Sequence, residues 1–300
     1  MKIGFIGLGQ MGRPIALNLL KSGADLVVSD LSDRHFEAFR AAGAKATTEI
    51  AEIAEADLIF LCLPNAKVVQ ATLLGDAGLL ARLSPHQTII DLSTITYAAT
   101  TEIAAAAAAR GVDFLDAPVS GMPIRAEDGT LTVMCGGTQA VFDRVRPTLA
   151  HIGATILFMG PSGSGQLTKL INQLLYDINA AAVAEVLPMA MKMGLDPELV
   201  GEVVNNSSGR SYASEYFIPR ILRGHFTDGY PMQDAYKDLV SAAELQAQQC
   251  VPMPVLAAAT ATYQTALRHG LGAQDKGAMI QVFEKLLGLE FRGKGFRNRT

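Results

Sequence analysis

The chain contains 300 residues, the length of roughly two domains, and 49% of them are hydrophobic, which excludes a disordered chain. The formal net charge of −4 disfavours a nucleic-acid partner, which would favour a basic surface. The three cysteines match no metal or redox spacing, and no apolar run reaches the roughly 18 residues of a membrane span, so we expect no metal site, no membrane partner and a cytoplasmic location.

The first half of the chain alternates short apolar runs with helical patterns. The apolar runs predict strands at 3–6, 26–28, 58–63, 88–91 and 112–116. The helical patterns predict helices at 11–21, 34–42 and 96–110, and two more strands are expected at 131–135 and 155–158. Continuous apolar strands separated by helices are typical of a parallel sheet that is covered on both faces.

From residue 165 onward the sequence predicts helices alone. A long helix is expected over 165–193, and shorter helices at 197–204, 211–222, 232–249, 255–268 and 274–287, separated by glycine and proline. The basic tail 292–300 is expected to be a frayed terminus, with covering of the site or contact with a partner as the alternative. We therefore predict an α/β domain over 1–161 and an all-helical domain over 162–300, joined by the long helix.

A glycine-rich turn follows the first predicted strand. Gly7, Gly9 and Gly12 form the pattern G-x-G-x-x-G, in which the glycines permit a tight turn, close approach of a pyrophosphate and close packing of helix on strand. The next helix would offer its N-terminal N–H groups to the phosphates. Asp30 ends the second strand, where a carboxylate accepts hydrogen bonds from the ribose hydroxyls and repels a 2′-phosphate. We predict that the cofactor is NAD rather than NADP; the alternative for Asp30 is a turn-forming role.

Three further motifs follow in order along the chain. They are DAPVSG at 116–121 with GTLT at 129–132, then Gly163-Ser164-Gly165 with Lys169 and Asn172, and last Lys237-Asp238-Leu239. Together with GFIGLGQMG at 4–12, these motifs make the sequence similar to the β-hydroxyacid dehydrogenase family, which includes 3-hydroxyisobutyrate dehydrogenase and tartronate semialdehyde reductase. The resemblance covers nearly the whole chain.

The resemblance implies both a fold and a reaction. The fold is a Rossmann-type doubly wound domain followed by an all-helical domain like that of 6-phosphogluconate dehydrogenase. The reaction is the NAD-dependent interconversion of a small β-hydroxy acid and its semialdehyde, in a homodimer or homotetramer. Cofactor binding is implied for the turn residues Gly7, Leu8, Gly9, Gln10, Met11 and Gly12.

Two loops that follow strands are expected to line the cofactor. Leu63, Pro64 and Asn65 follow one strand, and Ser93 and Thr94 follow the next. Ligands bind outside the carboxyl ends of parallel strands, and in the family these loops lie near the nicotinamide ribose. The alternative is ordinary loop chemistry, because Pro-Asn and Ser-Thr pairs are common at strand ends.

The loop at Ser120 and Gly121 is expected to bind the substrate carboxylate. Glycine permits an exposed turn whose N–H groups can hold an anion, and the resemblance implies this role. The family usually has a second glycine where this chain has Met122, followed by Pro123. The N–H of Met122 remains, but its backbone is less free and the pocket is expected to be narrower.

Lys169 and Asn172 lie three residues apart on the long helix and therefore share a face. A lone lysine on a helix is usually a solvated charge, but this one has apolar neighbours and a partly buried lysine suits acid/base work. The resemblance implies that Lys169 is the catalytic general acid/base, with Asn172 orienting the substrate or the lysine. The next position, often a second asparagine in the family, is Gln173.

Lys237 is implied by the resemblance to lie near cofactor and substrate. Taken alone, the short motif Lys-Asp-Leu would indicate only a helix surface with an ion pair. A non-catalytic, dinucleotide-bound interaction module on the same fold is the alternative function, and Lys169 with Asn172 disfavours it. Lys169 also disfavours an imine reductase, and a phosphogluconate dehydrogenase would have a longer helical domain.

Arg210 is a candidate for substrate selection. The run at 207–212, SSGRSY, is similar to that of 2-(hydroxymethyl)glutarate dehydrogenase, whose substrate carries two carboxylates. A guanidinium pairs with a carboxylate through two parallel hydrogen bonds, so Arg210 could hold a second acid group. The alternative is that Arg210 binds the last carbonyls of the preceding helix.

Overall fold

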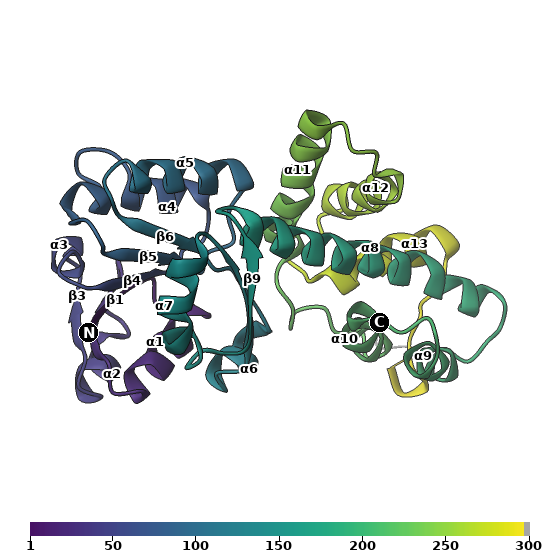
Figure 1. Ribbon diagram of the computed structural model, residues 1–300. Helices are drawn as coiled ribbons and strands as arrows, with labels where there is room; N and C mark the ends of the chain where they lie inside the picture. The colour runs from purple at the N-terminus through teal and green to yellow at the C-terminus, as the bar shows by residue number, and fades with distance from the viewer. Residues whose placement is uncertain (297–300) are drawn as a thin grey trace. The chain divides into compact units, whose positions relative to one another are not determined.

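The computed structural model describes residues 1–296 and divides into two compact units, Met1–Lys169 and Leu170–Thr300 (Figure 1). The first unit contains all the strands of the described residues together with helices, whereas the second unit is helical. The predicted order of α/β elements followed by helices alone is therefore confirmed.

The first unit is built on one nine-stranded sheet with the order β3-β2-β1-β4-β5-β6-β8-β7, in which β9 pairs with β8. Strands β1 to β6 are parallel, as predicted, whereas β8 runs antiparallel to β6 and β7. The strands are β1 (Lys2–Ile6), β2 (Asp25–Ser29), β3 (Lys45–Thr47), β4 (Leu58–Leu61), β5 (Thr88–Asp91), β6 (Asp113–Asp116), β7 (Val119–Ser120), β8 (Leu131–Gly136) and β9 (Gly153–Gly160). The chain order reverses between β1 and β4, the position where such sheets bind ligands at the carboxyl edge.

The central strands are buried on both faces. Successive side chains of a strand point to opposite faces, so Leu58 and Phe60 of β4 join one apolar cluster while Ile59 and Leu61 join the other. The same alternation holds in β2, where Val27 packs on the opposite side from its neighbours. This burial explains why the strands read as continuous apolar runs.

Helices cover both faces of this sheet. Figure 1 shows α4 and α5 on one face and α1 and α7 on the other. The helices of this unit are α1 (Gly12–Lys21), α2 (Phe36–Ala41), α3 (Ile50–Ile53), α4 (Ala66–Leu73), η1 (Leu79–Arg82), α5 (Tyr97–Ala108), α6 (Met122–Glu127) and α7 (Gln139–Leu149). The sequence did not predict α3, α4, α6 and α7, nor β3 and β7. Most of these are too short for a periodic pattern, and α7 contains Pro147.

Within the described residues the second unit consists of helices, all of which were predicted except η3. After the long α8 (Ser164–Lys192), which begins in the first unit, come α9 (Pro197–Asn206), α10 (Tyr212–Leu222), α11 (Met232–Gln249), α12 (Pro254–Arg268), η2 (Lys276–Met279), α13 (Ile280–Leu287) and η3 (Lys294–Phe296). The last predicted helix is thus a 3₁₀ turn followed by an α-helix. Their core is apolar around Tyr263, Phe217 and Phe291, which are almost completely buried.

Helix α8 is long and apolar enough to cross a membrane by length and composition, with 39% of its most apolar window buried. We expected no such segment, because no uninterrupted apolar run is long enough. The mean hydropathy of a window of this helix stays high although Asp177 and Glu185 interrupt its apolar run. One helix of this kind is weak evidence, because the core helix of a water-soluble protein has the same composition.

The basic tail is anchored rather than frayed where the structure describes it. The Arg292 side chain is buried and forms an ion pair with Glu284, and residues 294–296 form η3. The expectation of a frayed terminus is wrong for these residues, because the Arg292 guanidinium is removed from water and paired with the Glu284 carboxylate, which holds this part of the chain on α13. Residues 297–300 lie outside the described residues.

Candidate active site

The glycine-rich turn connects β1 to α1 with the geometry expected of a dinucleotide site. Gly7 has a φ of +99° and donates its N–H to the Ser29 carbonyl at 2.9 Å. A Cβ at Gly12 would lie 1.9 Å from the Gly7 carbonyl oxygen, so helix and strand could not pack this closely with any side chain there. A Cβ at Gly9 would meet no atom within 4 Å, which leaves open space where a phosphate can approach the backbone.

Asp30 is held beside this turn by two backbone donors. Its Oδ2 accepts the Leu8 N–H at 2.7 Å, and its Oδ1 accepts the Ser32 N–H at 3.0 Å. The bond to Ser32 is the turn-forming contact, while the bond to Leu8 ties the carboxylate to the glycine-rich turn. Each carboxylate oxygen retains a second lone pair, so both contacts are compatible with acceptance of ribose hydroxyls. The free lone pairs of the Asp30 carboxylate therefore fit the ribose of a dinucleotide.

The two strand-end loops are joined directly. The Leu63 N–H donates to Ser93 Oγ at 2.9 Å, which links the loop after β4 to the loop after β5. Asn65 also has a structural role, because its side chain accepts the Val68 N–H and caps α4. Pro64 and Thr94 lie in the same two loops, so the structure brings these predicted cofactor residues to one edge of the sheet.

Two buried carboxylates at this edge were missed by sequence reasoning. Asp91 and Asp116 are the last residues of β5 and β6, are paired in register, and are both fully buried. Burial raises the pKa of Asp91 to about 7, against the hydrogen bond from Ser93 that lowers it. Burial raises the pKa of Asp116 to about 6, against the backbone N–H groups of Gly163 and Gln166. The sequence signal that could have found them is that two successive apolar strands each end in an aspartate.

The predicted carboxylate loop adopts a strained backbone. Ser120 ends β7, Gly121 has a φ of +146°, and Met122 has a φ of +61°. The left-handed conformation of Met122 costs roughly 1–2 kcal/mol for a residue with a side chain, which explains why a glycine is usual there in the family. The loop is not an extended exposed turn, because α6 begins at Met122. The unexpected helix turns the chain immediately after Gly121.

Lys169 lies on α8 with only 8% of its surface exposed, so the expectation of a buried lysine is met. Asn172, in contrast, is exposed and makes a long contact of 3.5 Å to Gln173. In the helical unit the Gln173 amide donates to Asp238 Oδ2 at 3.3 Å, beside Lys237 on α11. Gln173, which departs from the family pattern, therefore connects α8 to the Lys-Asp-Leu motif.

The Arg210 guanidinium lies beside a carboxylate rather than the carbonyls that end α9, whereas its backbone N–H donates to the Ser207 carbonyl at 3.1 Å. Its guanidinium lies 3.6 Å from Glu215, and the two side chains are 64% and 50% exposed. The predicted capping contact is therefore not the one observed, because α9 extends to Asn206 and a carboxylate on α10 is close enough to compete. Two residues later the ring of Tyr212 packs edge-on against Tyr176 of α8, with centroids 5.6 Å apart.

Residues 2–160 match the protein family described as the NAD binding domain of 6-phosphogluconate dehydrogenase. Residues 163–283 match the family described as NAD-binding of NADP-dependent 3-hydroxyisobutyrate dehydrogenase. The 2-(hydroxymethyl)glutarate dehydrogenase of Eubacterium barkeri is 41% identical, over 98% of this chain and 98% of that one. The chain belongs to the β-hydroxyacid dehydrogenase family.

Other members of the β-hydroxyacid dehydrogenase family support the same assignment. The 3-hydroxyisobutyrate dehydrogenase of Pseudomonas aeruginosa is 35% identical, over 97% of this chain and 99% of that protein. The crystal structure of a 3-hydroxyisobutyrate dehydrogenase from Salmonella typhimurium superposes with a TM-score of 0.84 at 30% identity, covering 94% of this chain and 100% of that one. The chain is thus an oxidoreductase-family protein with a Rossmann NAD(P)-binding domain and a helical domain, and its homologues are hydroxyacid dehydrogenases.

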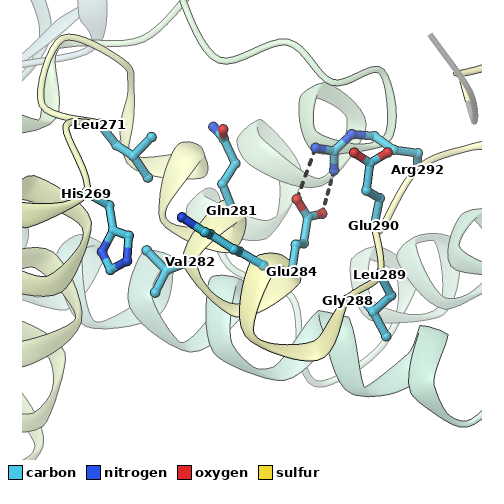
Figure 2. A pocket seen from close by; sticks show the side chains of 10 residues that line it. His269, Leu271, Gln281, Val282, Glu284, Gly288, Leu289, Glu290 and Arg292 are labelled. Carbon is cyan, nitrogen blue, oxygen red and sulfur yellow. Dashed lines mark hydrogen bonds and ion pairs between the residues drawn. The ribbon is translucent and has the colours of Figure 1, made fainter. Parts of the chain in front are cut away.

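A separate cavity of about 560 Å³ opens in the helical unit (Figure 2). It is lined by His269, Gln281, Lys285 and the ion pair of Glu284 with Arg292, among others. None of the predicted site residues lines this cavity. Glu284 and Arg292 neutralise one another there through two contacts at 2.6 and 3.1 Å.

Proposed function

We propose that this chain is an NAD-dependent dehydrogenase that interconverts a small β-hydroxy acid and its semialdehyde, with Lys169 as the general acid/base. The observation that carries the proposal is the burial of Lys169 on α8, one turn after residues that are hydrogen-bonded to the carboxyl edge of the sheet. A non-catalytic binding module would not require a buried amine there. We place the boundary between the NAD-binding and helical domains at residue 161, with α8 joining them.

The proposed reaction divides the work between cofactor and protein. When bound, NAD supplies the hydride acceptor, the nicotinamide C4. Lys169, as the neutral amine, takes the proton of the substrate hydroxyl while the C–H bond of the same carbon breaks and the carbonyl forms. In the reverse direction the Lys169 ammonium protonates the developing alkoxide. Asn172 and Lys237 are assigned to substrate and cofactor orientation.

Cofactor binding is assigned to the glycine-rich turn and the two strand-end loops. The phosphates would lie against Gly7, Leu8, Gly9, Gln10, Met11 and Gly12, with Leu63, Pro64, Asn65 and Thr94 beside the nicotinamide half. Asp30 is assigned to the adenosine ribose, where its negative charge opposes a 2′-phosphate. This preference for NAD over NADP is supported by the carboxylate held at the turn by the Leu8 N–H.

The substrate carboxylate is assigned to Ser120, Gly121 and Met122. Two substrate classes fit, a monocarboxylate such as 3-hydroxyisobutyrate and a dicarboxylate such as 2-(hydroxymethyl)glutarate. The exposed guanidinium of Arg210 favours the dicarboxylate, because its contact to Glu215 is long and solvent-exposed and a second substrate carboxylate can displace it.

We also propose that the protein is a cytoplasmic homodimer or homotetramer. The support is a set of exposed apolar side chains at helical spacing on α8, namely Ile171, Leu175, Val186 and Met189. Several large apolar side chains exposed on one helix favour a contact surface. Light scattering coupled to gel filtration measures the mass, and a monomer at micromolar concentration would contradict the proposal.

The test of the catalytic assignment is Lys169→Ala. Turnover should fall by roughly 100-fold or more, the scale of general acid/base catalysis, while NADH binding stays nearly unchanged. Lys192→Ala, at an exposed position near the end of the same helix, is the control. Near-normal turnover of Lys169→Ala with confirmed NADH binding would exclude the assignment.

The test of cofactor choice is Asp30→Ala. The wild type should use NADH with higher catalytic efficiency than NADPH, and the variant should bind NADH more weakly and discriminate less. Asp33→Ala changes an exposed carboxylate nearby and should leave the preference intact. A wild-type enzyme that is more efficient with NADPH contradicts the assignment.

A further inference from the structure

The side chain of Gln166 forms two hydrogen bonds to the backbone of the loop that carries Thr94. Gln166 lies in the first turn of α8 and only 3% of its surface is exposed. Its Nε2 donates to the Ser93 carbonyl at 2.7 Å, and its Oε1 accepts the Ile95 N–H at 3.2 Å. The two backbone groups flank Thr94. One side-chain amide therefore bonds the residues on both sides of Thr94, in the way that a neighbouring strand bonds a carbonyl and an N–H two residues apart.

The loop that carries Thr94 is also hydrogen-bonded to the loop after β4. Ser93 accepts the Leu63 N–H with its Oγ and donates its own N–H to Asp91 Oδ1 at 3.0 Å. A continuous chain of hydrogen bonds therefore runs from Leu63 through Ser93 to Gln166. All of these residues lie in the first unit.

The backbone of the same helical turn is fixed by Asp116. Its carboxylate accepts the Gly163 N–H at 2.7 Å and the Gln166 N–H at 3.0 Å. A Cβ at Gly165 would lie 2.7 Å from Asp116 Oδ2, so the turn fits the carboxylate closely. Lys169 follows Gln166 by three residues, which is a rise of about 4.5 Å and slightly less than one turn.

We propose that Gln166 is a positioning residue for the reaction, because its amide fixes the Thr94 loop relative to the helical turn that carries Lys169. This inference rests on the proposed role of Lys169 as general acid/base. An apolar side chain of the same length would make neither the bond to the Ser93 carbonyl nor the bond to the Ile95 N–H. The amide is needed to hold a donor and an acceptor of one loop at the same time.

The first test is Gln166→Met, which keeps the length of the side chain and removes both hydrogen bonds. Turnover should fall by about 10- to 100-fold, because misplacement by about 1 Å costs rate on that scale, while the Kd for NADH changes by only a few-fold. The matched control is Gln87→Met. The Gln87 amide likewise bonds backbone groups on both of its ends, because it donates to the Ala54 and Ala56 carbonyls and accepts the Ser84 N–H, but it lies at the start of β5 rather than its end. This control should lower the melting temperature and keep turnover within about twofold.

The second test separates positioning from stability. In a Lys169→Ala background, Gln166→Met should cause no further loss of turnover, because the group that it positions is absent. Losses that multiply in the double variant, or a Gln166→Met enzyme with turnover within about twofold of wild type, would overturn the inference. A Lys169→Ala enzyme with normal turnover, or a wild type that oxidises neither 3-hydroxyisobutyrate nor 2-(hydroxymethyl)glutarate, contradicts the proposed function itself.

The third test uses the isosteric acid Gln166→Glu. A carboxylate cannot donate to the Ser93 carbonyl, whereas the protonated acid can, so the ratio of variant to wild-type turnover should rise as the pH falls. Wild-type turnover at each pH corrects for the other groups at this edge, which are Asp91, Asp116, Cys62 and Lys169. A ratio that is independent of pH between 5 and 9 would contradict the role of the donated hydrogen bond.

Discussion

Buried carboxylates are satisfied in different ways in the two units. In the α/β unit, Asp91 and Asp116 are the last residues of β5 and β6, and both accept hydrogen bonds from backbone N–H groups. In the helical unit, Asp177 lies within α8 and is paired with Lys276, and Glu284 lies within α13 and is paired with Arg292.

The difference follows from where backbone N–H groups have no partner of their own. Strand ends and the first turn of a helix leave such groups, which can surround a buried carboxylate. Inside a helix each N–H is used by the carbonyl four residues earlier, so a buried carboxylate there takes side-chain partners, cationic ones for Asp177 and Glu284 and the Gln173 amide for Asp238. Asp275 agrees with this explanation, because it precedes η2 in the helical unit and accepts the Gly277 N–H at 2.9 Å.

The largest expected effect comes from removing a cation in the helical unit. Lys276→Met leaves Asp177 buried and unpaired, and should lower the free energy of unfolding by about 3–5 kcal/mol. Chemical denaturation measures this loss, and Lys285→Met, at an exposed position on α13, is the control. Adding Asp177→Leu to Lys276→Met should recover much of the loss, because the unpaired charge is then absent. A loss below about 1 kcal/mol would show that water or Tyr263 compensates Asp177.

The second prediction concerns the pH dependence of the α/β unit. Because burial raises the pKa of Asp91 to about 7, the protonated group stabilises the fold at low pH, and this stability is lost as the pH rises from about 4 to about 7. Asp91→Asn removes the titration. Its free energy of unfolding relative to wild type should therefore increase by about 2 kcal/mol between pH 5 and pH 8. Asp76→Asn, at an exposed site, should follow the wild-type curve. Parallel curves for Asp91→Asn and wild type would mean that Asp91 is charged throughout.

A smaller effect is expected where backbone donors surround the carboxylate. Asp116→Asn keeps one acceptor oxygen for the first turn of α8 and loses the charge, so the free energy of unfolding should fall by only about 1 kcal/mol. Hydrogen exchange at the Gly163 and Gln166 amides should become faster. Exchange that is unchanged at both amides would contradict the contacts of Asp116. Asp128→Asn provides an exposed comparison.

The smallest effect on stability is expected at the exposed pair of Arg210 with Glu215. Arg210→Ala should change the free energy of unfolding by less than about 0.5 kcal/mol, because exposed ion pairs contribute little. The same variant should erase a preference for dicarboxylic over monocarboxylic hydroxy acids by about 1.5–3 kcal/mol. Arg268→Ala, exposed at the end of α12, is the control. A wild type that prefers 3-hydroxyisobutyrate, or a variant that keeps a dicarboxylate preference, excludes this role.

Long or strongly apolar elements were predictable from the sequence, and so was the cofactor turn. The spacing of Gly7, Gly9 and Gly12 reports local requirements, a positive φ and close packing, which depend on residues near in sequence. Asp91 and Asp116 were not predicted, because an aspartate at a strand end also suits an ordinary turn. Gln166 was missed for a similar reason, since its partners lie more than 70 positions earlier in the chain.

Local chemistry therefore specified the longer elements, their order and the glycine-rich turn, and the family resemblance made Lys169 the catalytic candidate. The tertiary structure alone decided which polar groups meet at the carboxyl edge of the sheet, that Met122 adopts a left-handed backbone, and that Arg210 faces Glu215 rather than the end of α9. The physical reason is the range of the interactions. Glycine conformation and helical periodicity act over a few residues, whereas the hydrogen bonds of a buried polar group depend on strands and helices that only folding brings together.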